Sequence, residues 1–158
     1  MIFAAWVVFL LLAAWLFQGS LERQFNPNSN PESGTATDGR VEVLLERNRA
    51  GHYVSSGRIN GMSVEFLLDT GATDVAMSLA VADRLGLPHG APVTLSTANG
   101  VVRGYQTVIN EIALGDITRN KVRAVVSPGI RDDTVLLGMS FLKHIEMLQS
   151  GNTLLLRQ

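Results

Sequence analysis

The first 17 residues of the chain, from Met1 to Phe17, are apolar without exception. A helix packed on the surface of a soluble domain would show a polar stripe, and this run has none. As a helix it reaches about 25 Å, and extending it to Leu21 brings it close to the thickness of a hydrocarbon core. We therefore expect a transmembrane helix over residues 1–21. A cleaved signal peptide is the alternative, although a charged start and a small-residue cleavage site are both missing.

The character of the sequence changes over residues 22–39, which are mostly polar. From Asn26 to Thr35 no apolar residue is larger than proline, so this stretch has little that it could bury in a core. Such a composition predicts a flexible, partly extended linker. The folded domain is then expected over residues 40–158.

From Val41 onward, short β-branched runs alternate with glycine-containing turns, which is the pattern of a β-protein. Asn60-Gly61 and Asn99-Gly100 each predict a tight hairpin, because Asn and Gly tolerate the positive φ angles of such turns. The predicted strands are Val41–Glu46, His52–Ile59, Met62–Leu68, Val93–Ala98, Val101–Ile109, Glu111–Leu114, Val122–Ser127, Thr134–Leu137, Ile145–Gln149 and Thr153–Arg157.

Helix signals are few in this part of the chain. Ser78 is a suitable N-cap for a helix over residues 79–85, and Gly86 stands where such a helix would end. Met139 to His144 can add a short turn of helix. Many short strands with one or two short helices predict an all-β fold, either a small barrel or a sandwich-like domain.

Composition narrows the possible functions. Thirteen Lys and Arg residues against fourteen Asp and Glu give a net charge of −1, without the basic excess of a nucleic-acid-binding protein. The chain has no cysteine, which excludes disulfides, thiolate nucleophiles and cysteine-based metal sites. His52, His89 and His144 are far apart and match no metal-binding spacing. We expect no metal and no cofactor.

One acid stands out by its position. Asp69-Thr70-Gly71 follows directly on the apolar strand at residues 64–68. A carboxylate at the end of a buried strand is costly unless it is hydrogen-bonded or used in chemistry, which makes Asp69 the main catalytic candidate. Gly71 lets backbone amides approach the carboxylate, and Thr70 adds a hydroxyl group. The structural alternative is a hydrogen-bonded acid in an ordinary turn.

A second element echoes the first. Residues 135–138 again form an apolar run ending in glycine, with Leu137-Gly138 followed by the second expected helix. The two glycines, Gly71 and Gly138, lie 67 residues apart. The repetition indicates an internal duplication in which only the first copy carries an acid.

Phe66-Leu67-Leu68-Asp69-Thr70-Gly71-Ala72-Thr73, followed by Leu136-Leu137-Gly138, resembles the retropepsin-like (clan AA) aspartic proteases. The resemblance is greatest to the bacterial membrane-anchored members, in which one hydrophobic helix precedes the protease domain. It covers residues 40–158 and implies a closed β-barrel of the acid-protease half-domain type. It also implies a flap, a mobile hairpin over the substrate, at Ala98, Asn99, Gly100 and Val101.

The resemblance implies a mechanism as well. Two aspartates close together share one proton, and the ionised member activates a water that attacks the peptide carbonyl. The chain has one Asp-Thr-Gly and no Asp-Ser-Gly, so two copies of Asp69 must meet across a two-fold axis. The expected partners are a second copy of the chain, a peptide or protein substrate, and the membrane. Thr70 would brace the two loops, while Leu137 and Gly138 would support the site.

Two positions depart from the retroviral pattern. Retroviral relatives have an acid after Asp-Thr-Gly-Ala and an arginine after the second glycine, where this chain has Thr73 and Met139. We therefore do not expect that ion pair here. The acid at this position normally contacts the substrate backbone, and Asp74 is the nearby acid that can replace it. Ala72 is a second candidate for contact with the substrate.

The protease domain is expected outside the cytoplasm, in the periplasm, on the basis of the resemblance and the weakly charged N-terminus.

Two other functions compete with a protease. One is a catalytically inactive peptide-binding module on the same fold, and the other is an anchored interaction domain.

Overall fold

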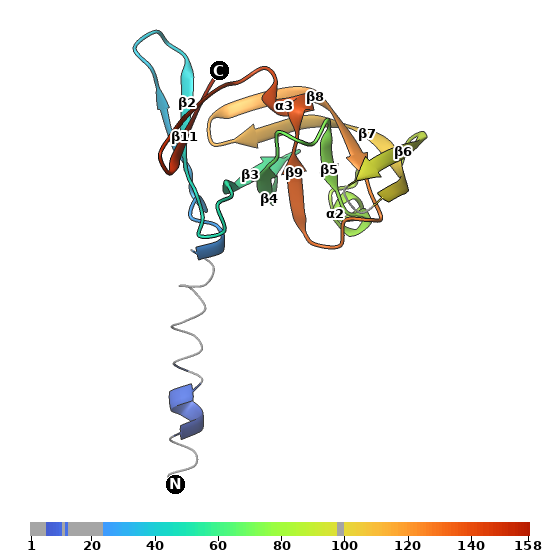
Figure 1. Cartoon of the computed structure of the whole chain (residues 1–158), viewed down its shortest axis with the longest axis horizontal. Coiled ribbons are helices and arrows are strands. Elements are labelled where there is room, and N and C mark those ends of the chain that lie inside the picture. Colours follow the sequence, from blue (N-terminus) through green and yellow to red (C-terminus); the bar gives the residue numbers. More distant parts are fainter. Residues whose placement is uncertain (1–5, 11, 13–23, 98–99) are drawn as a thin grey trace.

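The computed structural model describes residues 6–10, 12, 24–97 and 100–158. From Glu32 to Arg157 the described residues form two short helices and eleven strands, and the strands are arranged as two sheets (Figure 1). The elements are β1 (Glu32–Thr35), β2 (Val41–Glu46), β3 (Val54–Ile59), β4 (Met62–Leu68), β5 (Val75–Met77), α2 (Leu79–Arg84), β6 (Pro92–Thr97), β7 (Gly100–Leu114), β8 (Ile117–Val126), β9 (Thr134–Leu137), α3 (Met139–Leu142), β10 (Glu146–Ser150) and β11 (Thr153–Arg157).

The larger sheet closes into a barrel. Its strand order is β3-β4-β9-β5-β8-β7-β6, and β3 also pairs with β7, so that only β6 lies outside the closed ring. Successive side chains of a strand point to opposite faces, so every second residue of β4 points into the barrel. Val64 and Phe66 are buried there, while the other residues of β4 are more exposed. The interior is filled by such side chains from most strands and from both helices.

The smaller sheet covers one side of the barrel. Its strand order is β1-β2-β11-β10, and all of its pairings are antiparallel. Val43 and Leu45 on β2 and Leu154 and Leu156 on β11 are buried in the same core as the barrel residues. Figure 1 shows this sheet beside the barrel, with the C-terminus at its end.

Most strands predicted from the sequence are confirmed. The hairpin between β3 and β4 turns at Asn60 and Gly61, whose φ angles are 50° and 80°. The helix at Leu79–Arg84 begins at Ser78, whose side chain accepts a hydrogen bond from the Val81 amide. Two differences concern strand lengths: β7 is continuous through residue 110, and β8 starts earlier than predicted, at Ile117. The short strand β5 was not predicted.

The segment before residue 40 differs from the flexible linker that its composition predicted. Asn28 is buried, and its side-chain amide donates to the carbonyl oxygens of Glu46 at 2.9 Å and Val54 at 2.7 Å. Its side-chain oxygen accepts from the Glu46 amide at 2.7 Å. Residues Glu32–Thr35 then pair with β2 as strand β1. Hydrogen bonds of side-chain amides, rather than apolar burial, hold this segment on the domain. The prediction of a linker considered only the lack of apolar residues and therefore missed these hydrogen bonds.

None of the helices in the described ranges is long and apolar enough to cross a bilayer. The transmembrane helix predicted over residues 1–21 lies outside these ranges, apart from residues 6–10 and 12.

Candidate active site

Asp69 lies at the junction of two parallel strands. It follows β4 directly, and β4 pairs in parallel with β9 in a register that places Leu68 opposite Leu137. The backbone amide of Asp69 donates to the carbonyl oxygen of Leu137 at 3.2 Å. The two glycine-terminated strands recognised in the sequence are therefore neighbours, and the acid stands where they end.

The loop after Asp69 is folded around its carboxylate. The backbone amide of Gly71 donates to Asp69 Oδ1 at 2.9 Å, and the amide of Ala72 donates to the Asp69 carbonyl oxygen at 3.2 Å. A Cβ on residue 71 would lie 3.2 Å from the same Oδ1, so a side chain there would crowd the carboxylate. Asp69 is half-buried, whereas Thr70 and Gly71 are exposed. The carboxylate is thus fixed by backbone and still reachable from outside the chain.

The second glycine element, residues 135–138, and the start of α3 contact the Asp69 loop through backbone hydrogen bonds. The amides of Met139 and Ser140, at the start of α3, donate to the carbonyl oxygens of Ala72 and Thr73 at 2.8 and 2.9 Å. Gly138 is buried against the backbone of Ala72 and Asp74. Thr73 and Met139, the positions that depart from the retroviral pattern, are therefore linked to the opposite element through backbone hydrogen bonds.

Two supporting residues were missed by the sequence analysis. Ser140 Oγ accepts from the Val75 amide at 3.0 Å and donates to the carbonyl oxygen of Arg123 at 2.7 Å. The Arg123 guanidinium pairs with Asp74 at 2.7 Å. The carboxylate of Asp74, considered as a substrate contact, is engaged with Arg123 in this structure. A serine in the first turn after the second glycine was the available signal for Ser140.

The hairpin expected to act as the flap is formed by β6 and β7. These strands pair from Pro92 opposite Tyr105 up to Thr97 opposite Gly100. Gly100 has a φ of 109°, as a turn residue requires, and the side chain of Val101 is 71% exposed. Ala98 and Asn99 lie outside the described residues.

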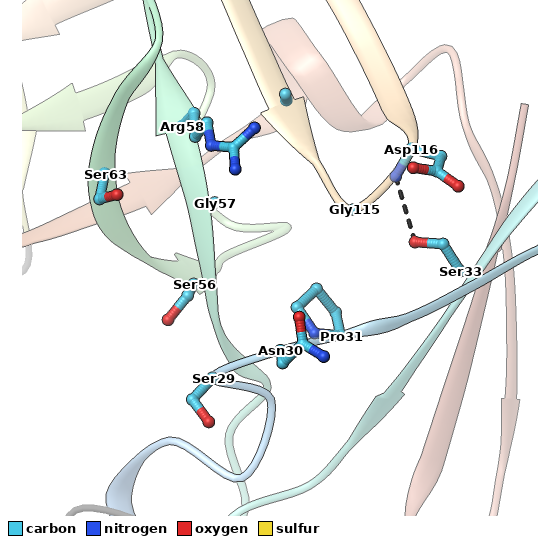
Figure 2. Close-up of a pocket in the computed structure, with 11 residues that line it drawn as sticks. Ser29, Asn30, Pro31, Ser33, Ser56, Gly57, Arg58, Ser63, Gly115 and Asp116 are labelled. Atoms are coloured by element: carbon cyan, nitrogen blue, oxygen red, sulfur yellow. Dashed lines mark hydrogen bonds between the residues drawn. The ribbon is translucent and has the colours of Figure 1, made fainter.

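A polar pocket of about 440 Å³ lies elsewhere (Figure 2). It is bounded by residues 29–31 and Ser33, by Arg58 on β3 and by the β7–β8 turn, where the Asp116 amide donates to Ser33 Oγ at 3.1 Å. No residue of the loop 69–74 lines it, so this pocket is separate from the carboxylate. Within the described ranges, no group of three or more acidic or histidine side chains is placed to hold a metal ion.

Comparison with known proteins identifies this arrangement. The model of the gag-polyprotein putative aspartyl protease family matches residues 55–144, which is more than half of the chain and includes both glycine elements. The chain belongs to the retropepsin-like aspartic proteases. The expectation from the Asp-Thr-Gly and Leu-Leu-Gly elements is thereby confirmed at the level of family and fold.

Solved structures of retropepsin-like proteases share the fold. A crystal structure of a retropepsin-like aspartic protease from Rickettsia conorii superimposes with a TM-score of 0.61 at 26% identity, covering 80% of this chain and 94% of that one. The EIAV protease complexed with the inhibitor HBY-793 gives a TM-score of 0.51 at 21% identity, covering 63% and 93%. The second likeness concerns the fold alone.

Two curated bacterial proteins align with most of the chain. A protein in the cobV 5′ region of Sinorhizobium sp is 36% identical over 118 residues, and the protein RP867 of Rickettsia prowazekii is 29% identical over 118 residues. Each alignment covers 73% of this chain. The chain spans about half the length of the curated relatives it matches, 51% and 50%.

Proposed function

We propose that the chain is an aspartic endopeptidase that acts as a homodimer, with one Asp69 contributed by each copy. The observation that carries the proposal is the loop at the β4–β9 junction, where a backbone amide holds one oxygen of a half-buried carboxylate. The sequence contains a single Asp-Thr-Gly, and this chemistry needs two acids. A second copy of the same loop is the simplest source of the other acid.

In the proposed dimer, two Asp69 carboxylates lie close enough that both cannot ionise together, so they share a proton. The ionised carboxylate takes a proton from a water molecule, which attacks the carbonyl carbon of the scissile peptide. The protonated carboxyl group donates to the carbonyl oxygen and later helps to protonate the leaving amine. The Gly71 amide on Oδ1 keeps each carboxylate oriented during these steps.

The substrate proposed for this site is an extended peptide lying between the catalytic loops and the β6–β7 hairpin. The exposed side chain of Val101 supports this placement, because an apolar side chain near the hairpin tip gains a partner when a substrate residue packs on it. Thr70, exposed in the single chain, is proposed to brace the two loops against each other.

We also propose that residues 1–21 anchor the protein in a membrane with the protease domain outside the cytoplasm. The support is the unbroken apolar run from Met1 to Phe17. Anchoring confines copies to two dimensions and raises their effective concentration, which favours a dimer. Adding an external protease to spheroplasts tests the orientation: degradation of the domain in intact spheroplasts is expected, and protection until lysis contradicts it.

The test of the function is hydrolysis of a denatured protein by the full chain in detergent, compared with Asp69→Asn. We expect no turnover from the variant, while Asp132→Asn, in an exposed loop, keeps full activity. Dilution is expected to lower the rate per chain, and adding Asp69→Asn chains to the unmodified protein is expected to inhibit it. Activity that survives Asp69→Asn, or that belongs to a monomer, contradicts the proposal. Peptide binding without any hydrolysis favours the inactive peptide-binding module.

A further inference from the structure

The loop of residues 47–52, which connects β2 to β3, is bound to the residues at which the described domain begins. The Asn48 side-chain amide donates to the carbonyl oxygen of Phe25 at 2.9 Å, and Arg49 Nη1 donates to Gln24 Oε1 at 2.9 Å. Figure 1 shows residues 24 and 25 at the end of the domain opposite to the C-terminus. The loop therefore lies at this same end.

A single buried side chain, that of Asn48, gives the loop its shape. Its Oδ1 accepts hydrogen bonds from the backbone amides of Ala50 at 3.0 Å and His52 at 2.9 Å. The Asn48 backbone amide donates to the carbonyl oxygen of His52 at 2.8 Å, which closes the loop. Because the same side chain also holds Phe25, the loop and the start of the domain form one packed unit.

This unit lies next to the anchor proposed over residues 1–21. Two residues separate Leu21 from Gln24 in the sequence, and three Cα–Cα steps of a chain cover at most about 11 Å. The hydrogen bonds of Gln24 and Phe25 to the loop leave no further length of free chain between them. If residues 1–21 lie in a bilayer, the loop at residues 47–52 lies beside its headgroups, and the inference below rests on that proposed anchor.

The loop carries positive charge that no acid compensates. Residues 47–53 read Arg-Asn-Arg-Ala-Gly-His-Tyr, with two arginines and no acid. Arg49 is exposed, and the half-buried guanidinium of Arg47 lies 5.3 Å from the ring centroid of Tyr53. Within the described ranges, neither arginine forms an ion pair, not even with Glu46 at the end of β2.

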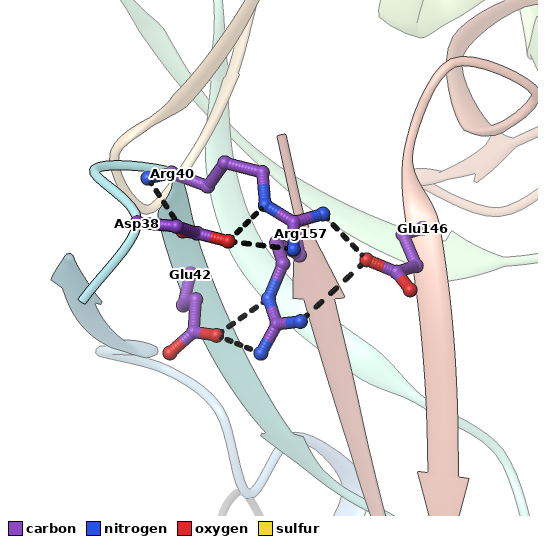
Figure 3. Close-up of polar contacts among 5 residues, drawn as sticks. All are labelled: Asp38, Arg40, Glu42, Glu146 and Arg157. Atoms are coloured by element: carbon purple, nitrogen blue, oxygen red, sulfur yellow. Dashed lines mark hydrogen bonds and ion pairs between the residues drawn. The ribbon is translucent and has the colours of Figure 1, made fainter. Parts of the chain in front are cut away.

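The opposite end of the same sheet is different (Figure 3). There Arg40 pairs with Asp38 at 2.7 Å and with Glu146 at 2.8 Å, while Arg157 pairs with Glu42 and lies 3.6 Å from Glu146. Each arginine of this network has acidic partners, so its charge is balanced within the domain. Unpaired arginines at the end of the sheet near Gln24 thus contrast with paired arginines at the far end.

An exposed aromatic side chain accompanies the unpaired arginines. The side chain of Phe25 is 54% exposed, although its backbone is held by Asn48. One exposed apolar residue alone is ordinary on a protein surface. Aromatic rings next to basic residues, however, are typical of surfaces that lie in the headgroup region of a membrane.

We propose that the loop at residues 47–52 and the Phe25 side chain form a contact surface for anionic lipid headgroups. Arg49 faces the lipid phosphates, and Phe25 enters the boundary between headgroups and acyl chains. Each basic residue beside an anionic membrane surface strengthens the attraction about five-fold. Lipid charge, rather than the anchor alone, then holds this end of the domain on the bilayer.

The contact also sets how the Asp69 loop is presented. Tyr53 directly follows the contact surface, and its carbonyl oxygen accepts from the amide of Leu68 at 3.0 Å. Leu68 is the residue before Asp69. The strand that carries the catalytic candidate is therefore joined to the lipid-binding end of the domain, and Asp69 keeps a fixed orientation relative to the membrane.

The absence of cysteine allows a direct test with the full chain in lipid vesicles. Ala50→Cys, exposed in the loop, is labelled with a fluorophore, and a nitroxide on a fraction of the phosphatidylcholine headgroups serves as quencher. We expect stronger quenching when phosphatidylglycerol replaces part of the phosphatidylcholine. Thr37→Cys, exposed in the turn at the other end of β2, is the matched control and should not respond. Equal quenching of Ala50→Cys in the two kinds of vesicle, or none in either, overturns the proposal.

A charge reversal tests the residue that carries the recognition. In the labelled Ala50→Cys chain, Arg49→Glu should abolish the additional quenching that phosphatidylglycerol causes. Lys143→Glu makes the same change in charge directly after α3, at an exposed position, and should leave the quenching unchanged. Equal effects of the two substitutions would show that only the net charge of the protein matters, which contradicts the proposal.

The outcomes for surface, anchor and enzyme separate. A chain that stays in the vesicles after washing with alkaline carbonate, but is quenched equally with and without phosphatidylglycerol, keeps the anchor and removes the surface. Release by the same wash removes the anchor, and the surface with it. Hydrolysis of a denatured protein in detergent should be the same for Arg49→Glu and the unmodified chain, so a failure of the enzyme proposal leaves the quenching result unaffected.

Discussion

Gly138 lies directly against the carbonyl oxygen of Ala72, so that a Cβ on residue 138 would come within 2.7 Å of it. The next residue, Met139, donates its backbone amide to the same oxygen at 2.8 Å. The catalytic loop and the second glycine element therefore interlock through backbone atoms, and the contact requires the absence of a side chain at residue 138. This relationship gives the first prediction.

Gly138→Ala should displace the loop that carries Asp69. Because the obstructing atoms are backbone, they cannot rotate away, and we expect a loss of about 2 kcal/mol in the free energy of unfolding. Turnover of a denatured protein should fall at least about ten-fold, because small displacements of catalytic groups are costly. Gly34→Ala is the matched control, since a Cβ there meets no atom within 4 Å. Wild-type stability and activity in Gly138→Ala would show that the loop tolerates this displacement.

Ser140→Ala tests the hydroxyl that links α3 to β5 and β8. The substitution leaves the buried Val75 amide without its acceptor and the Arg123 carbonyl oxygen without this donor. An unpaired buried backbone group costs about 1–3 kcal/mol, and we expect a loss of that size in urea unfolding. Ser63→Ala, at an exposed position, should stay within about 0.5 kcal/mol of the unmodified protein. Equal effects of the two variants would contradict a structural role for Ser140.

Asn28→Ala tests whether the segment before residue 40 belongs to the folded domain. The variant loses three hydrogen bonds, and leaves the buried Val54 carbonyl oxygen and the part-buried backbone groups of Glu46 without these partners. We expect a loss of about 3 kcal/mol in the free energy of unfolding. The exposed Asn30→Ala should be close to neutral. A free linker would make both substitutions neutral, which is the result that contradicts the docked segment.

Glu65 predicts a dependence of stability on pH. Its Oε1 is buried without a hydrogen-bond partner in the described part of the chain. Burial raises the pKa of Glu65 above its ordinary 4.5, offset in part by the Asn26 side chain. The folded state then holds the proton to a higher pH than the unfolded state, so the free energy of unfolding falls as the pH rises above 4.5.

Glu65→Gln imitates the protonated acid at every pH. We therefore expect the variant to be more stable than the unmodified protein at about pH 7, with the difference closing as the pH falls below 4.5. Urea unfolding at a series of pH values measures this difference, and Glu32→Gln on the exposed strand β1 gives the background. A difference that stays constant with pH would show that the carboxyl group is not responsible.

Much of this fold is predictable from the sequence because its signals are local. Short apolar and β-branched runs between turns predict β2, β4 and β11 with the bounds that the structure has, and Asn60-Gly61 predicts the hairpin between β3 and β4. The Asp69 loop and its partner Gly138 are recognisable because each follows an apolar strand. These signals can be recognised from neighbouring residues, although the contacts between the Asp69 loop and the second glycine form between distant parts of the chain.

The missed features depend on distant partners. Strand β5 has three residues and exists because β8 and β9 flank it on either side. Ser140 and Arg123 support the loop through contacts spanning 17 to 65 residues, which no local pattern reveals. The docking of Asn28 likewise relies on carbonyl groups that only the assembled strands present.

The parallel pairing of β4 with β9 also determines when the site can form. Paired residues such as Leu68 and Leu137 are neighbours in space but lie far apart in the sequence. Contacts between distant parts of a chain form slowly. A nascent chain emerging from the ribosome completes the support of Asp69 only after β9 and α3 have been synthesised. Incomplete chains therefore lack the backbone hydrogen bonds that Leu137, Met139 and Ser140 contribute to the Asp69 loop, and under the proposed function this delay would limit proteolysis during translation.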